Sequence, residues 1–352
     1  MGGIRWGDSS IDSTDGIHSV ETKSASGSCA DWDGEGCFGA RKELKQLGLD
    51  LKPVRGKGLG LVASRDFDKG EVVLAERALV KVRNTSASAS WTRQQAVSVL
   101  RQVSKMSGEE RDGLLKLSAR QDSKQPLVLR IVSNNCFNID LRTFGVFLNI
   151  SRINHSCAPN CIDSAGSDES EKIVLALRRI CSGEELSLSY LHAPEGSKAM
   201  RAAELKYWNF VCTCVLCLCE GRGESILREN IVKMVGGVSR FVGQLEKARD
   251  EEPHMEDDQK RLLSASIYCE IREQLKVCEN LVVLVNQLSH PPPLLQLSSH
   301  LHAARLGVKK YSLGLEGPYL LKVYKNTYNL CAVDSNLPDK LVHCHQNYFG
   351  WF

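Results

Sequence analysis

Asn154-His155-Ser156-Cys157-Ala158-Pro159-Asn160 is the most specific stretch of this sequence. Further along the chain stands Gly183-Glu184-Glu185-Leu186-Ser187-Leu188-Ser189-Tyr190. A third string follows, in which Cys212, Cys214 and Cys217 have the spacing C-x-C-x-x-C. The three strings in this order are far more specific than any one of them alone.

Cysteine density makes the third string a candidate metal site. Cys212, Cys214 and Cys217 supply three thiols within six residues, which packing of reduced buried thiols explains poorly. A structural zinc ion takes four ligands in a tetrahedron, so the string needs one more. Cys29 and Cys37 are isolated and cannot complete such a site by themselves. The dispersed cysteines are interpreted as core residues: Cys161, Cys181, Cys269, Cys278, Cys331 and Cys344.

The composition is ordinary for a globular protein. The chain has 352 residues, of which 42% are hydrophobic and 25% charged, and its net charge is +3. This near balance does not favour direct binding to nucleic acid or an anionic membrane. No apolar run approaches the roughly 18 residues of a membrane span, and the N-terminus lacks the apolar segment of a secretory signal. We therefore expect a cytoplasmic and/or nuclear protein with reduced cysteines.

Local patterns divide the chain into segments. Residues 1–45 are rich in Ser, Gly and Asp and are predicted to be a disordered lead-in. From Pro53 onward, short apolar runs between glycine turns predict strands, with further strands at 128–139, 145–150, 173–177 and 186–190. Residues 84–130 interrupt them with a predicted two-helix insert. Residues 223–352 are predicted to be helical, with one apolar stripe at Leu263, Ile267, Ile271, Leu275, Cys278 and Val282.

The three strings together resemble the SET family, in the order that this family uses them. The upstream Gly56-Lys57-Gly58-Leu59-Gly60 resembles the opening strand pair, so the resemblance covers roughly residues 53–218. Within the family the chain is most similar to the SMYD-type branch, through Ser151-Arg152-Ile153, Asn135 to Ile139 and Phe210. SMYD proteins carry a MYND zinc finger, yet residues 81–130 contain no cysteine and no histidine. We therefore expect the chain to lack that finger.

The resemblance implies an α+β fold, the SET-domain β-fold of small curved sheets with a pseudoknot. It divides the chain into a SET domain over residues 46–192, a post-SET zinc-binding segment over 193–222 and an α-helical C-terminal domain over 223–352. It implies that Cys157 is the fourth zinc ligand, with Cys219 as the competing candidate. It also implies a protein-lysine methyltransferase that uses S-adenosylmethionine and acts on a histone or non-histone protein.

Residue roles follow from the same resemblance. Tyr190 is expected to be catalytic, at the mouth of the methyl-transfer channel. Trp208 and Phe210 are its expected aromatic walls, with Tyr207 as a register alternative. SMYD-type chains tend to have tyrosine where this chain has Trp208, which leaves the degree of methylation open. The expected cofactor-binding residues are Lys57, Gly58, Leu59, Gly60, Asn135, Ser151, Asn154, His155 and Phe210.

Methyl transfer to lysine makes a definite physical demand. The amine must be neutral to attack, and with an ordinary lysine pKa of about 10.4 neutralisation at pH 7 costs roughly 4–5 kcal/mol. Desolvation and the positive charge of a sulfonium both lower that pKa, and holding the reacting atoms in line supplies an entropic advantage.

Two other functions remain open: a catalytically inactive SET-fold interaction module and, with less support, a nucleic-acid binder.

Overall fold

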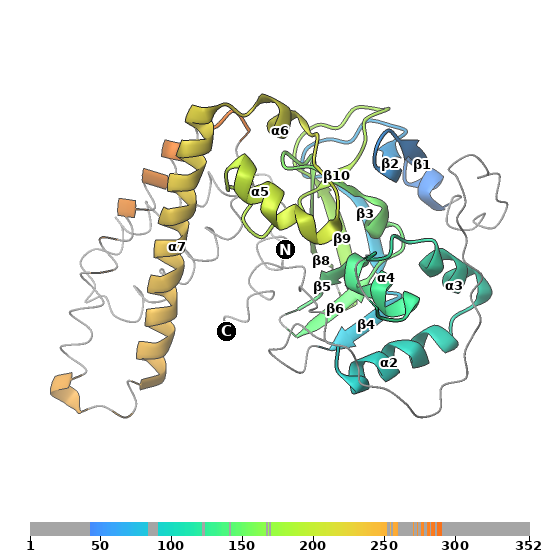
Figure 1. Cartoon of the computed structure of the whole chain (residues 1–352), viewed down its shortest axis with the longest axis horizontal. Coiled ribbons are helices and arrows are strands. Elements are labelled where there is room, and N and C mark those ends of the chain that lie inside the picture. The colour runs from blue at the N-terminus through green and yellow to red at the C-terminus, as the bar shows by residue number, and fades with distance from the viewer. Residues whose placement is uncertain are drawn as a thin grey trace. The chain divides into compact units, whose positions relative to one another are not determined.

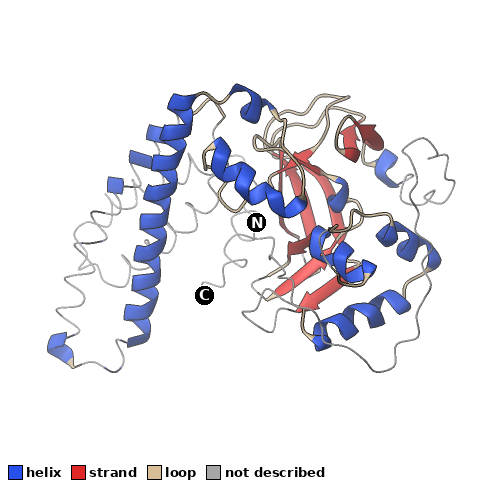
Figure 2. Ribbon diagram, in the orientation of Figure 1, coloured by secondary structure: helices blue, strands red, loops and turns tan. Residues whose placement is uncertain are grey.

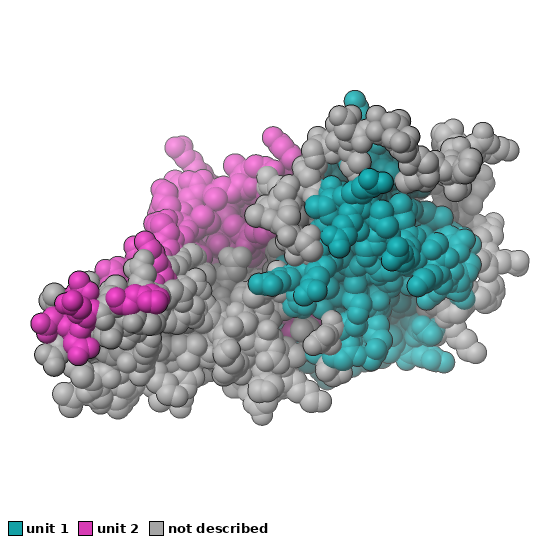
Figure 3. Space-filling model, turned by 90° about the horizontal axis from the view of Figure 1, so that it is seen from below, with its two compact units in different colours: residues 1–154, 165–187 teal, residues 155–164, 188–352 magenta. Residues whose placement is uncertain are grey.

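The computed structural model describes residues 43–83, 91–121, 124–140, 142–166, 168, 170–251 and scattered positions between 254 and 290 (Figure 1). The chain forms two compact units, shown in different colours in Figure 3. The first unit comprises residues 1–154 and 165–187, and the second comprises residues 155–164 and 188–352. Most of the predicted lead-in lies outside the described residues, although residues 43–46 are already helical.

A β-hairpin opens the first unit. Strand β1 (Leu49–Val54) pairs antiparallel with β2 (Gly58–Ala63), with Val54 opposite Gly58. Gly56 and Gly58 have φ angles of 75° and 81°, a conformation that glycine adopts without steric penalty. The backbone N–H of Leu186 donates to the carbonyl of Leu61, so the glutamate-rich string lies beside β2.

Further antiparallel pairings contribute to this unit. Strand β3 (Val72–Arg77) pairs with β9 (Glu171–Ala176), with a register irregularity between Val72 and Leu74. A three-stranded sheet has the order β4-β6-β5. Its strands are β4 (Val80–Arg83), β6 (Thr143–Val146) and β5 (Cys136–Asn138). The strand predicted over 173–177 is thus confirmed.

A helical insert packs on that three-stranded sheet (Figures 1 and 2). Both predicted helices are present as α2 (Arg93–Ser104) and α3 (Gly108–Leu115). Each begins with a capping box, Thr92 with Gln95 and Ser107 with Glu110, which satisfies backbone N–H groups of the first turn. A third helix, α4 (Leu127–Asn135), completes the insert.

Helix α4 shows that the strand predicted over 128–139 was wrong for most of its length. Only β5, at its end, is extended. The segment is a short apolar run, and such a run fits a buried strand or a buried helix equally well by pattern. Leu129 and Val132, one helical turn apart, are both buried in the core that the insert shares with β4 and β6, and this packing selects the helix.

The strand predicted over 145–150 is also shorter than expected. Strand β6 ends at Val146, and a 3₁₀ turn, η1 (Ile150–Arg152), follows. Short elements then carry the motif strings: β7 (Asn154–His155), β8 (Cys161–Ala165) and β10 (Ser187–Leu188). The predicted pseudoknot and domain boundaries stay predictions.

The second unit is mainly helical where it is described. Its elements are α5 (Lys198–Leu205), the 3₁₀ turn η2 (Lys206–Trp208), α6 (Val215–Cys219) and the long α7 (Arg222–Glu251). Ile231 and Val235 on α7 pack against Leu281 and Val285. The predicted stripe from Leu263 to Val282 lies outside the described residues. Among the helices described, none is both long and apolar enough to cross a membrane.

Candidate active site and metal centre

In the first unit, the side chains of Asn154 and Lys57 both contact the carboxylate of Glu185. The Asn154 side-chain Nδ2 donates to Glu185 Oε1 at 3.0 Å and lies 3.3 Å from the carbonyl oxygen of Leu59. Lys57 Nζ forms an ion pair with Glu185 Oε2 at 2.7 Å. The structure therefore brings together three of the predicted cofactor-binding residues. Sequence reasoning missed Glu185 as their common partner, although it stands in the second quoted string.

Gly60 is the point of closest approach in this cluster. A Cβ atom built on Gly60 would lie 2.6 Å from Asn154 Nδ2 and 2.8 Å from Val54 Cγ2, both far inside van der Waals contact. Gly60 is also buried, whereas its neighbour Gly58 has open space where a side chain would be. Because Gly60 has no side chain, the Asn154 amide can lie directly against its backbone.

Ser151 and Asn135, two of the residues expected to bind the cofactor, also lie together. Ser151 Oγ is 3.3 Å from the backbone carbonyl of Asn135, and the turn η1 that carries Ser151 contacts β2. The Asn135 side chain has an internal role. Its Nδ2 donates to the carbonyls of Ser118, at 2.6 Å, and Ile131, at 2.8 Å, and fastens the end of α4.

Glu76 anchors the turn that leads into Ser151 and Asn154. Its carboxylate accepts hydrogen bonds from the backbone N–H groups of Asn149, at 3.0 Å, and Ile150, at 2.9 Å. Burial raises the pKa of this carboxyl from 4.5 to about 7, against the opposing effect of the backbone donors. Nothing in the sequence around Glu76 indicated this role, because its partners stand 73 residues away.

In the second unit, the His155 ring connects Tyr190 to a cysteine. The Tyr190 backbone N–H donates to His155 Nδ1 at 3.0 Å, and His155 Nε2 lies 3.3 Å from Cys157 Sγ. Because a backbone N–H can only donate, Nδ1 is the acceptor and the neutral ring carries its proton on Nε2. His155 is 4% exposed. Its side chain is thus used for positioning, so the predicted cofactor contact would fall to its backbone.

Aromatic rings surround Tyr190. Its ring centroid lies 5.4 Å from that of Trp208 and 6.5 Å from that of Phe210, the latter edge to face. His155 completes the group, 5.2 Å from Tyr190. Between the two walls, Asn209 has a φ of 55°, a left-handed conformation that asparagine tolerates better than most residues. Trp208 and Phe210, the predicted walls, therefore both contact Tyr190.

Tyr207, the register alternative, packs against Trp208 at a centroid distance of 4.9 Å. Phe210 is 37% exposed, so this side of the aromatic group is open to solvent. An apolar, partly open enclosure of this kind suits the methylene stem of a lysine and can favour its cationic head.

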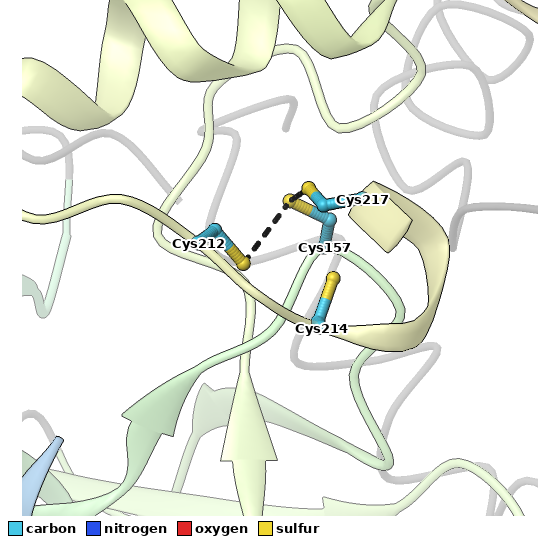
Figure 4. Close-up of side chains that lie close together, drawn as sticks. All are labelled: Cys157, Cys212, Cys214 and Cys217. Atoms are coloured by element: carbon cyan, nitrogen blue, oxygen red, sulfur yellow. Dashed lines mark hydrogen bonds between the residues drawn. The ribbon is translucent and has the colours of Figure 1, made fainter. Parts of the chain in front are cut away.

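Four cysteines gather in the second unit (Figure 4). The Sγ atoms of Cys157, Cys212, Cys214 and Cys217 all lie within 4.8 Å of one another. Cys157 follows β7, Cys217 is on α6, and the other two come from the segment before that helix. The Cys157 sulfur is 3.5 Å from that of Cys217 and 3.9 Å from that of Cys212.

The donor set fits zinc. Four thiolates in a tetrahedron with zinc–sulfur bonds of ~2.3 Å would have sulfur–sulfur edges of ~3.8 Å, close to the spacing here. The contact with Cys157 lowers the pKa of the Cys217 thiol to about 6 and also lowers that of Cys214, whereas the pKa values of Cys157 and Cys212 are raised. Cys219 is exposed and stands outside this group. The geometry thus favours Cys157 over Cys219 as the fourth donor.

Comparison with known protein families gives these features a class. Residues 58–191 match the SET domain. This segment, which contains β2, the Asn154 string and Tyr190, is a SET domain with the small antiparallel sheets described above.

Curated proteins that it matches include set5 and SMYD proteins. The histone-lysine N-methyltransferase set5 of Schizosaccharomyces pombe is 28% identical over 171 residues, which are 48% of this chain and 50% of that protein. Mouse SMYD3, also named a histone-lysine N-methyltransferase, is 25% identical over 46% of this chain and 42% of its own length. Human SMYD1, also named a histone-lysine N-methyltransferase, is 34% identical over 84 residues, which are 21% of this chain and 17% of that protein. The chain spans half or less of the length of each of these relatives. It is SMYD-like. The absence of a MYND finger stays a prediction.

Proposed function

We propose that the chain is an S-adenosylmethionine-dependent protein-lysine N-methyltransferase that acts on histone or non-histone lysines. The observation that carries this proposal is that Tyr190, in the segment that matches the SET domain, is enclosed by His155, Trp208 and Phe210. The names of the relatives support the same activity. We expect the protein to work in the cytoplasm, the nucleus or both, and to need no membrane or nucleic-acid partner.

In this mechanism the protein prepares the lysine. The apolar walls of Trp208 and Phe210 desolvate the side chain, which lowers its pKa and favours the neutral amine. The proton leaves to solvent before attack. The Tyr190 hydroxyl then accepts or donates a hydrogen bond that aims the nitrogen lone pair, while the His155 ring holds the Tyr190 backbone in place. S-adenosylmethionine would supply the methyl group, and the amine that accepts it would carry a positive charge.

S-adenosylmethionine would supply the activated methyl group on its sulfonium. We propose that this chain holds it through Lys57, Gly58, Leu59, Gly60, Asn135, Ser151, Asn154, His155 and Phe210. The Lys57 ammonium suits a carboxylate, and the Asn154 amide offers both a donor and an acceptor. Glu185, which contacts Lys57 and Asn154 here, keeps both side chains in place for a ligand.

Zinc, in this proposal, is structural. Cys157, Cys212, Cys214 and Cys217 would hold one ion and thereby fasten the segment after β7 to the segment before α6. Trp208 and Phe210 stand just before Cys212, so the ion would also fix the aromatic walls beside Tyr190. No step of methyl transfer requires it.

The decisive experiment compares wild type with Tyr190→Phe, using Tyr207→Phe as the matched control. Each protein is incubated with methyl-labelled cofactor and either purified histones or a cell extract. We expect labelling by wild type and by Tyr207→Phe, and a loss of at least 100-fold in Tyr190→Phe, the order of a lost catalytic group. Equal labelling by all three proteins would contradict the catalytic role of Tyr190.

Calorimetric titration with S-adenosylmethionine tests the inactive-module alternative. We expect binding by wild type and by Tyr190→Phe alike, because the proposed cofactor contacts do not include the Tyr190 hydroxyl. A wild-type protein that is folded and binds no cofactor would be an interaction module instead.

A further inference from the structure

Arg201, on α5, is buried beside the cysteine cluster. Its side chain is completely inaccessible to solvent. Nη2 lies 3.7 Å from Cys217 Sγ, within the range of a hydrogen bond to sulfur, and Nη1 donates to the carbonyl of Gly196 at 2.6 Å. The guanidinium also forms an ion pair with Glu220 at 2.7 Å. One planar cation therefore faces a thiol on one side and a carboxylate on the other.

The partners of Glu220 show how the charges are distributed. The Glu220 side chain is inaccessible to solvent, accepts a hydrogen bond from the Lys198 backbone N–H at 2.8 Å, and lies 3.4 Å from Arg228. Arg228 has a second carboxylate, Glu224, at 2.8 Å. Two arginines and two glutamates thus balance one another before any thiolate is counted. It is the guanidinium group of Arg201 that contacts a cysteine, Cys217.

A metal bound by four thiolates changes this balance. A zinc ion with four thiolates carries a net charge of −2, which is costly in a buried place unless donors approach the sulfurs. Charge-assisted hydrogen bonds are the stronger kind, and the planar guanidinium fork can serve the sulfur and Glu220 at once. Partners of this kind tune metal sites, and their loss commonly weakens metal affinity by about 10–100-fold.

We propose that Arg201 is a positioning residue of the zinc site, which neutralises the thiolate of Cys217 and links the metal to the buried ion pairs of α5, α6 and α7. The proposal rests on the zinc site of the proposed function. It assigns to Arg201 a role beyond packing: the affinity of the site for metal depends on its charge. A purely structural Arg201 would instead serve only to hold the three helices together through Glu220.

Variants of the full chain separate these two roles. Arg201→Gln removes the charge and Arg201→Lys keeps it. Glu220→Gln breaks the ion pair but leaves Arg201 free to face Cys217. Arg222→Gln, at an exposed position on α7, is the matched control. The zinc content of each purified protein and its rate of zinc transfer to a competing chelator are measured, with circular dichroism to monitor folding.

We expect Arg201→Gln to lose zinc about 10–100-fold more readily and Arg201→Lys to restore part of that loss. Glu220→Gln and Arg222→Gln should retain zinc as wild type does. Equal loss in Glu220→Gln and Arg201→Gln would mean that the role is structural and would overturn the proposal. So would wild-type zinc retention by a folded Arg201→Gln. A wild type without zinc would overturn both this proposal and the proposed metal site, whereas a zinc-loaded protein without methyl transfer would affect only the catalytic proposal.

Cobalt substitution gives a readout that folding alone does not move. The thiolate-to-cobalt charge-transfer absorption depends on the electron density at sulfur, which a hydrogen bond from Arg201 withdraws. We expect this band to move to lower energy in Arg201→Gln and to stay in place in Glu220→Gln. An unshifted band in cobalt-loaded Arg201→Gln would refute the contact.

Discussion

Gly60→Ala should impair cofactor binding, mainly by displacing the Asn154 amide, while Val54 must also shift. The added methyl would start 2.6 Å from Asn154 Nδ2, whereas ordinary contact begins near 3.4 Å, so the amide must retreat by about 0.8 Å. That shift lengthens its 3.0 Å hydrogen bond to Glu185 beyond the normal range. Gly60 does not have a positive φ, so the backbone itself accepts alanine. The effect is therefore one of space alone.

The expected size follows from the interactions that are disturbed. A hydrogen bond to a charged group contributes about 1.5–3 kcal/mol, and overpacking of a tight site costs about 1–3 kcal/mol of stability. We expect an affinity for S-adenosylmethionine about 10–100-fold lower, which corresponds to roughly 1.4–2.8 kcal/mol. Calorimetric titration measures the affinity, and urea unfolding measures the stability.

Two comparisons make this prediction sharp. Gly108→Ala, at the start of α3, meets no atom within 4 Å and should leave binding unchanged. In a double-mutant cycle, Gly60→Ala should weaken binding much less once Asn154→Ala has removed the amide. A folded Gly60→Ala protein with wild-type affinity would refute the placement of Asn154 at the cofactor site.

Three further predictions concern stability and positioning. Because burial raises the pKa of Glu76 from 4.5 to about 7, its contribution to stability is fully present below pH 4.5 and is lost as pH rises through 7. Urea unfolding from pH 4.5 to 8 should thus show a decline of up to about 3 kcal/mol that Glu76→Gln lacks, and parallel profiles would contradict the shift. His155→Ala removes the acceptor of the Tyr190 N–H and a neighbour of Cys157. We expect the free energy of unfolding to fall by about 1–3 kcal/mol and zinc to be released faster to a chelator. Unchanged zinc retention would show that His155 does not support the metal site. Ser133→Ala takes from the buried Trp91 indole a 2.9 Å acceptor, so unfolding should become easier by about 1–3 kcal/mol while cofactor affinity stays the same; a change in affinity would show that the insert is coupled to the site.

The sequence predicted elements well where local signals agree with packing. Helices α2 and α3 have capping boxes and apolar spacing, and both appear where expected. Helix α4 was misjudged because its apolar run has no decisive period, and only the neighbouring sheet selects the helix. The strand predicted over 145–150 ends at Val146, and the turn that follows it is bonded to Glu76, which lies far away in the chain.

Some residues of the candidate site were predicted from the sequence and others were missed. Cys212, Cys214 and Cys217 were predicted from their spacing, and Tyr190, Trp208 and Cys157 from the family resemblance; the structure gathers them in the second unit. Glu185 and Arg201 were missed, because their roles depend on partners that folding brings near. Lys57, for example, is 128 residues from Glu185. A charged residue shows no sign of such a partner in its local sequence.

The cysteine cluster also has a consequence for the order of folding. Cys157 leaves the ribosome 55 residues before Cys212, so the first donor must wait while β8, β9 and β10 are made. Closing a loop of that length restricts the unfolded chain by an amount worth about 4 kcal/mol in chain-entropy terms. Zinc would therefore join the two segments only late in folding. A chain interrupted between Leu188 and Cys212 would contain every described strand yet lack three of the four proposed zinc donors.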